Sequence, residues 1–352
     1  MRLSQDAINR LNGIFYAAAP YEHLEHRLFL ILSETDTTGT PPDTQTFRQF
    51  QDVFLRTAGA ESAETADAAR SAEEPDDDLS VTPDEHRIID SIVLAFQAGE
   101  TLLRMHLAHL AVRDGLAQSG WLAVSNRNQG QFRNNVVTLA SKTDSELRED
   151  IKWLHIAPEV LSPENTIENL DARIDGVLDT GAAWIKHFAR QYLDLGPLYN
   201  AAKHGLAVIP GYHSIEFYPE SPSAHDPSLP LLRGATVQYL EQPPNEEDPR
   251  RQWVRTMQVA DMPLLLATAH IATDYLRNLW GVARVRYAGS QRANLFLLTG
   301  PTPQSLRAGS MEGRIRFPIN YVPISGDAAV QFLAARGHQV LSPAPTDAQE
   351  DS

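Results

Sequence analysis

The fold is decided by one stretch, TPDEHRIIDSIVLAFQAGETLLRMHLAHLAVRDG, which runs from Thr82 to Gly115. Its first threonine suits a helix cap, Pro83 suits the first helical position, and Glu85 completes a capping box. Apolar residues then recur at steps of three and four as far as Leu110, which predicts that one face is buried along the whole helix. Gly99 interrupts this stripe at a cost in helix stability, which predicts that another helix approaches closely there. The sequence therefore predicts a long central helix.

Helical periodicity continues on both sides of this stretch up to residue 205. The further helical segments are residues 6–19, 20–31, 47–55, 131–140, 144–155, 163–195 and 197–205. Beyond residue 205 the pattern becomes strand-like, with two more helices expected at 263–280 and 326–336. The candidate strands are 206–209, 214–218, 235–240, 252–259, 282–287, 293–298 and 314–319. The predicted fold class is α+β, mainly α, with an N-terminal helical bundle followed by a smaller region of antiparallel sheet plus helix.

Composition sets two segments apart from the rest of the chain. Residues 58–81 are rich in acidic side chains and almost free of large apolar ones, so burial cannot offset the entropy of ordering them. We predict a disordered acidic loop there and a disordered tail at 341–352. The predicted domains are a helical bundle over 1–205 and a smaller α+β region over 206–340. The net charge of −15 lies largely in the acidic segments, so it neither indicates nor excludes RNA binding.

Absent residues and motifs narrow the possible functions. The chain has no cysteine, which excludes disulfides, thiolate zinc sites and cysteine nucleophiles. It shows no signal-peptide core and no apolar run of the roughly 20 residues that a membrane span needs, which predicts a cytoplasmic protein without membrane association. Phosphate loops, dinucleotide fingerprints, HExxH motifs and nucleophile elbows are also absent from the sequence. No cofactor is therefore predicted.

Ionisable residues recur inside apolar helix at two places. In ETLLRMHLAH, Glu100 precedes Arg104 by four residues, so the two side chains can form an ion pair on one helix. This pair is either exposed, or inside the bundle, where it would hold the guanidinium in a fixed orientation. In YNAAKHG, Asn200 and His204 share a helical face beside Lys203. Lys203 and His204 either belong to a functional polar cluster or only stabilise the C-terminal end of a helix, where positive charge is favourable.

The spacing of Arg104 and His109 in RMHLAH, with four residues between them, resembles the arginine–histidine signature of the HEPN superfamily of helical proteins. The resemblance spans residues 83–205 and implies a bundle that is usually dimeric. Many members of this superfamily cleave RNA without a metal. By this resemblance, Arg104 would stabilise the charged phosphorane and His109 would move the proton of the 2′-hydroxyl.

The same resemblance assigns roles to the second polar stretch. Lys203 and His204 would complete the catalytic set, and Glu100 and Asn200 would bind or orient the substrate. The expected function is RNA binding or metal-independent RNA cleavage by a homodimer, in a stress, toxin or phage-defence setting. The alternative is a non-catalytic interaction or scaffold protein, in which the same polar groups set helix register or a dimer interface.

Two pairs of histidines raise the question of a metal site. His23 and His26 share one helical face, and His106 and His109 share another. Four imidazoles could bind zinc or iron if these helices met. No accompanying carboxylate pattern supports such a site, and the first pair lies in a charged context that is typical of a solvated surface. The sequence therefore predicts no metal site.

Overall fold

The computed structural model describes residues 3–19, 21–33, 83–126, 128–157, 160, 169–203, 207–217, 229–242, 253–289, 300–307 and 314–318. Its helices are α1 (Gln5–Ala17), α2 (Glu22–Ser33), α4 (Pro83–Arg113), α5 (Gly120–Ser125), α6 (Gln129–Ser141), α7 (Asp144–His155), α8 (Leu170–Asp194), α9 (Gly196–Lys203), α10 (Met262–Ala288) and α11 (Pro303–Arg307). Its strands are β1 (Val208–Phe217), β2 (Leu229–Glu241), β3 (Val254–Val259) and β4 (Arg314–Pro318). The predicted class, α+β and mainly α, is confirmed.

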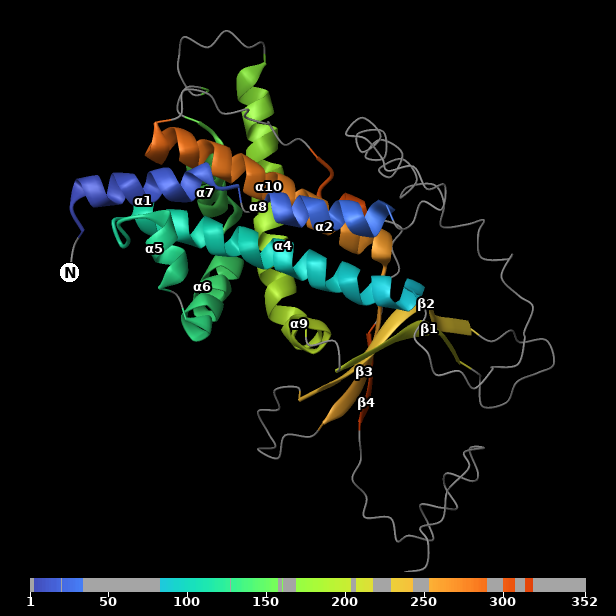
Figure 1. Ribbon diagram of the computed structural model, residues 1–352. Coiled ribbons are helices and arrows are strands. Elements are labelled where there is room, and N and C mark those ends of the chain that lie inside the picture. Colours follow the sequence, from blue (N-terminus) through green and yellow to red (C-terminus); the bar gives the residue numbers. More distant parts are fainter. Residues whose placement is uncertain are drawn as a thin grey trace, which may run out of the picture.

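Helix α4 is the centre of the fold, as its sequence predicts (Figure 1). It contacts α2, α5, α6, α7, α8, α9 and α10 as well as β1 and β2. Leu94, Leu102 and Leu103 enter the larger core together with side chains of α8 and α10. Ile88 and Ile92, nearer the start of the helix, enter a smaller core that includes residues of the sheet. One helix thus connects both cores.

The close approach predicted at Gly99 is also confirmed. A Cβ atom added at this position would lie 3.2 Å from Cδ1 of Phe188 on α8, which is tighter than an ordinary van der Waals contact. Phe188 is buried beside the α4 backbone. The glycine therefore lowers the helix propensity of α4 but allows α4 to pack closely against α8.

The four strands form one antiparallel sheet in the order β1-β2-β3-β4. The register shifts between Ile215 and Glu216, where β1 has an irregularity opposite β2. Val208, Val237 and Tyr239 pack into the smaller core against Leu198 of α9 and the first half of α4. The sheet therefore lies against the N-terminal half of the central helix (Figure 1).

The C-terminal part of α10 differs from the prediction. Residues 282–287 alternate in a strand-like manner, but α10 continues through them to Ala288 and ends with Gly289 in the left-handed conformation. Val282 and Ala283 are buried on the face that packs into the bundle, and this burial overrides the short alternating pattern. Ala283 belongs to the same core as Leu102 of α4. Helix α10 thus lies in the helical body, although the sequence placed it in the region after residue 205.

Helix boundaries follow local signals elsewhere. Helix α7 begins at Asp144 as predicted, and Thr143 and Glu146 form a capping box in which each side chain binds the other residue's backbone.

Several predictions fall outside the described residues, namely the cap at Thr82, the helical run at 47–55, the acidic loop at 58–81, the strand at 293–298, the helix at 326–336 and the tail at 341–352. Among the helices that the structure describes, none combines the length and apolar character required to cross a membrane.

Candidate functional site

The ion pair predicted between Glu100 and Arg104 is formed on α4. Nη2 of Arg104 lies 2.6 Å from Oε1 of Glu100, and the side chains are 24% and 16% exposed, respectively. The pair is thus half-buried, between the two alternatives that the sequence left open. A guanidinium in this setting is held more firmly than one in an exposed pair.

Further contacts fix the orientation of Arg104. Its Nη2 donates to Oε1 of Gln129 on α6 at 2.9 Å, and its Cζ lies 4.1 Å from the ring centroid of Phe132. Gln129 in turn donates from Nε2 to the hydroxyl of Tyr192 on α8 at 2.8 Å. We call Glu100, Arg104, Gln129 and Tyr192 the polar network. It connects α4, α6 and α8 through directional interactions, namely charge-assisted and neutral hydrogen bonds, and the guanidinium also stacks on the Phe132 ring.

Helix α9 brings a tyrosine to this network. Tyr199 stacks on Phe96 with ring centroids 5.2 Å apart. Burial, followed by the negative charge of Glu100 and the hydrogen bond to it, raises the pKa of Tyr199 to about 12. Asn200 and Lys203 are exposed, and the Lys203 ammonium lies 6.0 Å from the Tyr199 ring centroid. Helix α9 thus reaches Glu100 through Tyr199, which the sequence reasoning missed, and not through the expected Asn200 or Lys203. His204 lies outside the described residues.

His109 occupies a different environment. It is 1% exposed, its Nδ1 lies 2.7 Å from the carbonyl oxygen of Met105, and its Nε2 lies 2.7 Å from the hydroxyl of Tyr16. Because a carbonyl can only accept, Nδ1 carries the ring proton, and Tyr16 donates to Nε2. Burial lowers the pKa of His109 to about 4, although the hydrogen bond to Met105 acts in the opposite direction. His109 is therefore an enclosed, neutral imidazole.

The structure does not bring Arg104 and His109 together. Arg104 contacts α6, whereas His109 contacts Tyr16 of α1 and lies against Gly120 of α5. The reason is helix geometry, since residues five apart on a regular helix point about 140° away from each other. The arginine–histidine spacing on its own thus does not define a shared site within one chain.

The two histidine pairs do not meet either. His23 and His26 are exposed on α2, whereas His106 and His109 are buried inside the bundle. In the described ranges, no group of three or more His, Cys, Asp or Glu side chains is arranged to hold a metal ion. Instead, His106 lies near His155 of α7, with ring centroids 6.5 Å apart. Neither ring forms a hydrogen bond with any described residue.

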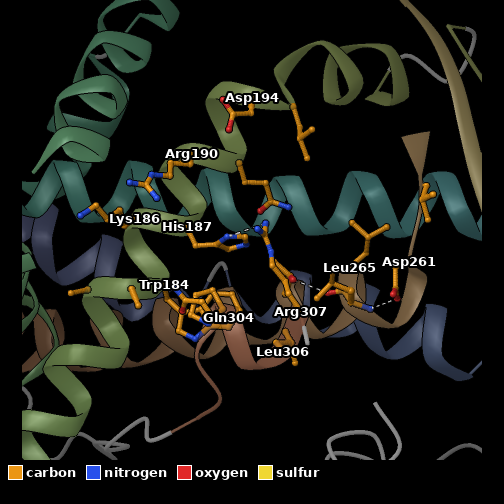
Figure 2. Close-up of a pocket in the computed structure, with 18 of the residues that line it drawn as sticks. Trp184, Lys186, His187, Arg190, Asp194, Asp261, Leu265, Gln304, Leu306 and Arg307 are labelled. Atoms are coloured by element: carbon orange, nitrogen blue, oxygen red, sulfur yellow. Dashed lines mark hydrogen bonds between the residues drawn. The ribbon is translucent and has the colours of Figure 1, made fainter. Parts of the chain in front are cut away.

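A pocket of about 970 Å³ lies between α8, α10, α11 and strand β3 (Figure 2). His187 and Arg190 of α8 line one part of it, and Arg307 of α11 lies 3.4 Å from Nδ1 of His187 through its Nη2. Arg314 of β4 also lines it and donates to Oε1 of Gln258 at 3.2 Å. The pocket thus collects cations from three elements.

Sequence reasoning did not find this pocket. Lys186 and Arg190 stand four apart on α8 and would have indicated one basic helical face. Arg307, however, is 120 residues from His187, and no spacing rule connects them. Their meeting depends on the way α11 packs against α8.

No protein-family model, curated protein or solved structure matches this chain. The HEPN resemblance therefore stays a prediction from residues 83–205.

Proposed function

We propose that this chain is a non-catalytic binding protein, in which the polar network fixes the register of the helices. The observation that carries this proposal is the enclosure of His109. A general base must come within about 3 Å of the proton that it removes. Both ring nitrogens of His109 are already engaged inside the bundle, by Met105 and Tyr16. An RNA 2′-hydroxyl would have to displace a buried tyrosine to reach this imidazole.

The contacts of Arg104 support the same proposal. Its guanidinium is paired with Glu100, bonded to Gln129 and stacked on Phe132. A cation that stabilises a phosphorane needs donors directed at the reacting phosphate. Here Nε and Nη2 of Arg104 are engaged by Glu100 on the same helix and by Gln129 on α6, which is the role of a group that sets packing geometry. RNA and a second copy of the chain, the partners that the HEPN resemblance implies, are the first ones to test.

The decisive experiment is incubation of the purified chain with a mixed RNA pool in the presence of EDTA. We expect no cleavage above background from the wild type, His109→Ala or His204→Ala, with His26→Ala as an exposed control. Cleavage by the wild type that His109→Ala or His204→Ala abolishes, while circular dichroism shows an intact fold, would contradict the proposal. Fluorescence anisotropy with the same RNA would measure binding separately from cleavage.

A further inference from the structure

A group of buried polar side chains lies where α4, α7 and α10 pack together. His106 of α4 is 0% exposed and His155 of α7 is 3% exposed, and no nitrogen of either ring forms a hydrogen bond with a described residue. We propose that these two imidazoles bind one internal water molecule, which bridges α4 and α7 through a hydrogen bond to each ring. The site is separate from the polar network and from the pocket beside α11, so it goes beyond the proposed function.

Both rings are neutral at physiological pH. Burial, then the positive charge of Lys142 and the neighbouring His109 and Arg113, lowers the pKa of His106 to about 3. Burial, then the neighbouring His106 and His109, also lowers the pKa of His155. A neutral imidazole has one N–H donor and one acceptor nitrogen. The two rings thus place donors and acceptors inside the core, where leaving them without partners costs free energy.

The distance between the rings identifies the ligand. Their centroids are 6.5 Å apart, so even nitrogens directed straight at each other would be about 4.3 Å apart, since each is roughly 1.1 Å from its ring centre. A direct hydrogen bond needs about 3 Å. A tetrahedral zinc ion with bonds of about 2.0–2.1 Å holds two nitrogens about 3.4 Å apart. One water molecule with two hydrogen bonds of about 2.9 Å spans about 4.7 Å, and of these three only water reaches both rings.

Helix α10 adds further polar groups beside His155. Tyr275 packs edge-on against the His155 ring, with centroids 5.5 Å apart. Asn278, three residues later on α10, donates from Nδ2 to the carbonyl oxygen of His155 at 3.1 Å. The Tyr275 hydroxyl and Oδ1 of Asn278 are buried and form no hydrogen bond with a described residue. An internal water typically makes about three hydrogen bonds, so polar groups beyond the two rings suit this site.

The site lies at the C-terminal end of α7, where the last carbonyl groups of a helix lack partners within the helix. Asn278 binds the carbonyl oxygen of His155, and Nη2 of Arg286 donates to that of Ile156 at 3.4 Å. Helix α10 thus binds the end of α7 through two side-chain donors. The bridging water would add the polar connection from this end of α7 to α4.

The direct test is a crystal structure of the full chain at a resolution that shows ordered water. We expect one oxygen peak within about 2.7–3.2 Å of a nitrogen of His106 and of a nitrogen of His155. Absence of a peak between the two rings would overturn the inference. A peak with the anomalous signal of a transition metal would overturn it too, because it would assign a metal ion to the site.

Magnetic relaxation dispersion of water nuclei gives a second readout in solution, because it counts the water molecules that stay long inside the protein. His106→Leu and His155→Leu should each lose a single long-lived water relative to the wild type. His26→Gln is the matched control, because His26 is exposed on α2. An equal count in the wild type and the two leucine variants would overturn the inference. Circular dichroism checks that these variants fold, and if they do not, the crystal structure of the wild type decides.

Discussion

The hydroxyl of Tyr16 lies 2.7 Å from Nε2 of His109, and it joins α1 to the C-terminal part of α4 inside the core. Both residues are buried, and 93 residues separate them in the chain. Nδ1 of His109 is bonded to Met105, so the tyrosine satisfies the last polar atom of the ring. His109, which the sequence put forward as a catalytic base, is thus hydrogen-bonded on both ring nitrogens as part of the folded core.

Removing the Tyr16 hydroxyl tests this role. Tyr16→Phe leaves Nε2 of His109 buried without a donor, so we expect a loss of about 1–2 kcal/mol in the free energy of unfolding. Urea denaturation followed by circular dichroism would measure it. Tyr192→Phe removes a tyrosine hydroxyl from the half-buried polar network, where water can take its place, and should cost less. An equal or larger loss from Tyr192→Phe would contradict the importance of the Tyr16 contact.

Stability should fall as the pH falls below about 6.5. Burial lowers the pKa of His106 to about 3 and that of His109 to about 4, and lowers that of His155 as well, whereas a histidine in an unfolded chain titrates near 6.5. Between these values the unfolded chain binds protons that the folded chain excludes. Each such histidine therefore lowers the free energy of unfolding by up to about 1.4 kcal/mol per pH unit, and none does so above this window.

Urea midpoints between pH 7.5 and 4.5 would measure this slope. His106→Leu removes one of the buried titrating rings and should flatten the dependence on pH, whereas His26→Gln, at an exposed site, should leave it nearly unchanged. The same slope in His106→Leu as in the wild type would assign the acid sensitivity to other groups.

Asp150 of α7 should be essential for stability. Its carboxylate is 4% exposed and is bound by Nη1 of Arg113 at 2.8 Å and by Nζ of Lys142 at 2.5 Å. Asp150→Asn removes the charge but leaves both cations, so we expect a loss of roughly 3 kcal/mol. Asp175→Asn is the control, because that carboxylate is 64% exposed and pairs with Arg148 at the surface. A thermal midpoint shift in Asp175→Asn as large as that in Asp150→Asn would disprove the distinction.

Two glycines should respond to substitution in opposite directions. Gly176 of α8 has open space where a Cβ would lie, so Gly176→Ala should stabilise the protein by about 0.5–1 kcal/mol through helix propensity. Gly99 faces Phe188, so the larger side chain in Gly99→Leu should push α4 away from α8. We expect this to lower the free energy of unfolding by about 1–3 kcal/mol. Chemical denaturation of the two variants would test this. Tolerance of leucine at Gly99 would mean that the helices can separate without loss.

The helical polar residues could be found from sequence, but their partners could not. The i, i+4 spacing of Glu100 and Arg104 is a local property and correctly predicts their ion pair. Gln129 is 25 residues from Arg104 in the chain, and Tyr192 is 63 residues from Gln129. Neither residue therefore carries a local signal of the network. Tyr199 was present in the YNAAKHG stretch, yet only the docking of α9 beside Phe96 gives it a role.

The sequence by itself determined what depends on neighbours a few residues apart. The capping box of Thr143 and Glu146 and the three- and four-residue spacing of the α4 stripe are set within a turn or two of helix. Gly99 predicts a close approach, but its partner Phe188 comes from the packing of α8. Tertiary structure alone decided which groups meet across the chain: Tyr16 with His109, and His187 with Arg307. The physical reason is that these contacts follow from how helices pack, and packing fixes the burial that decides whether an ionisable side chain is part of the core or free to bind a ligand.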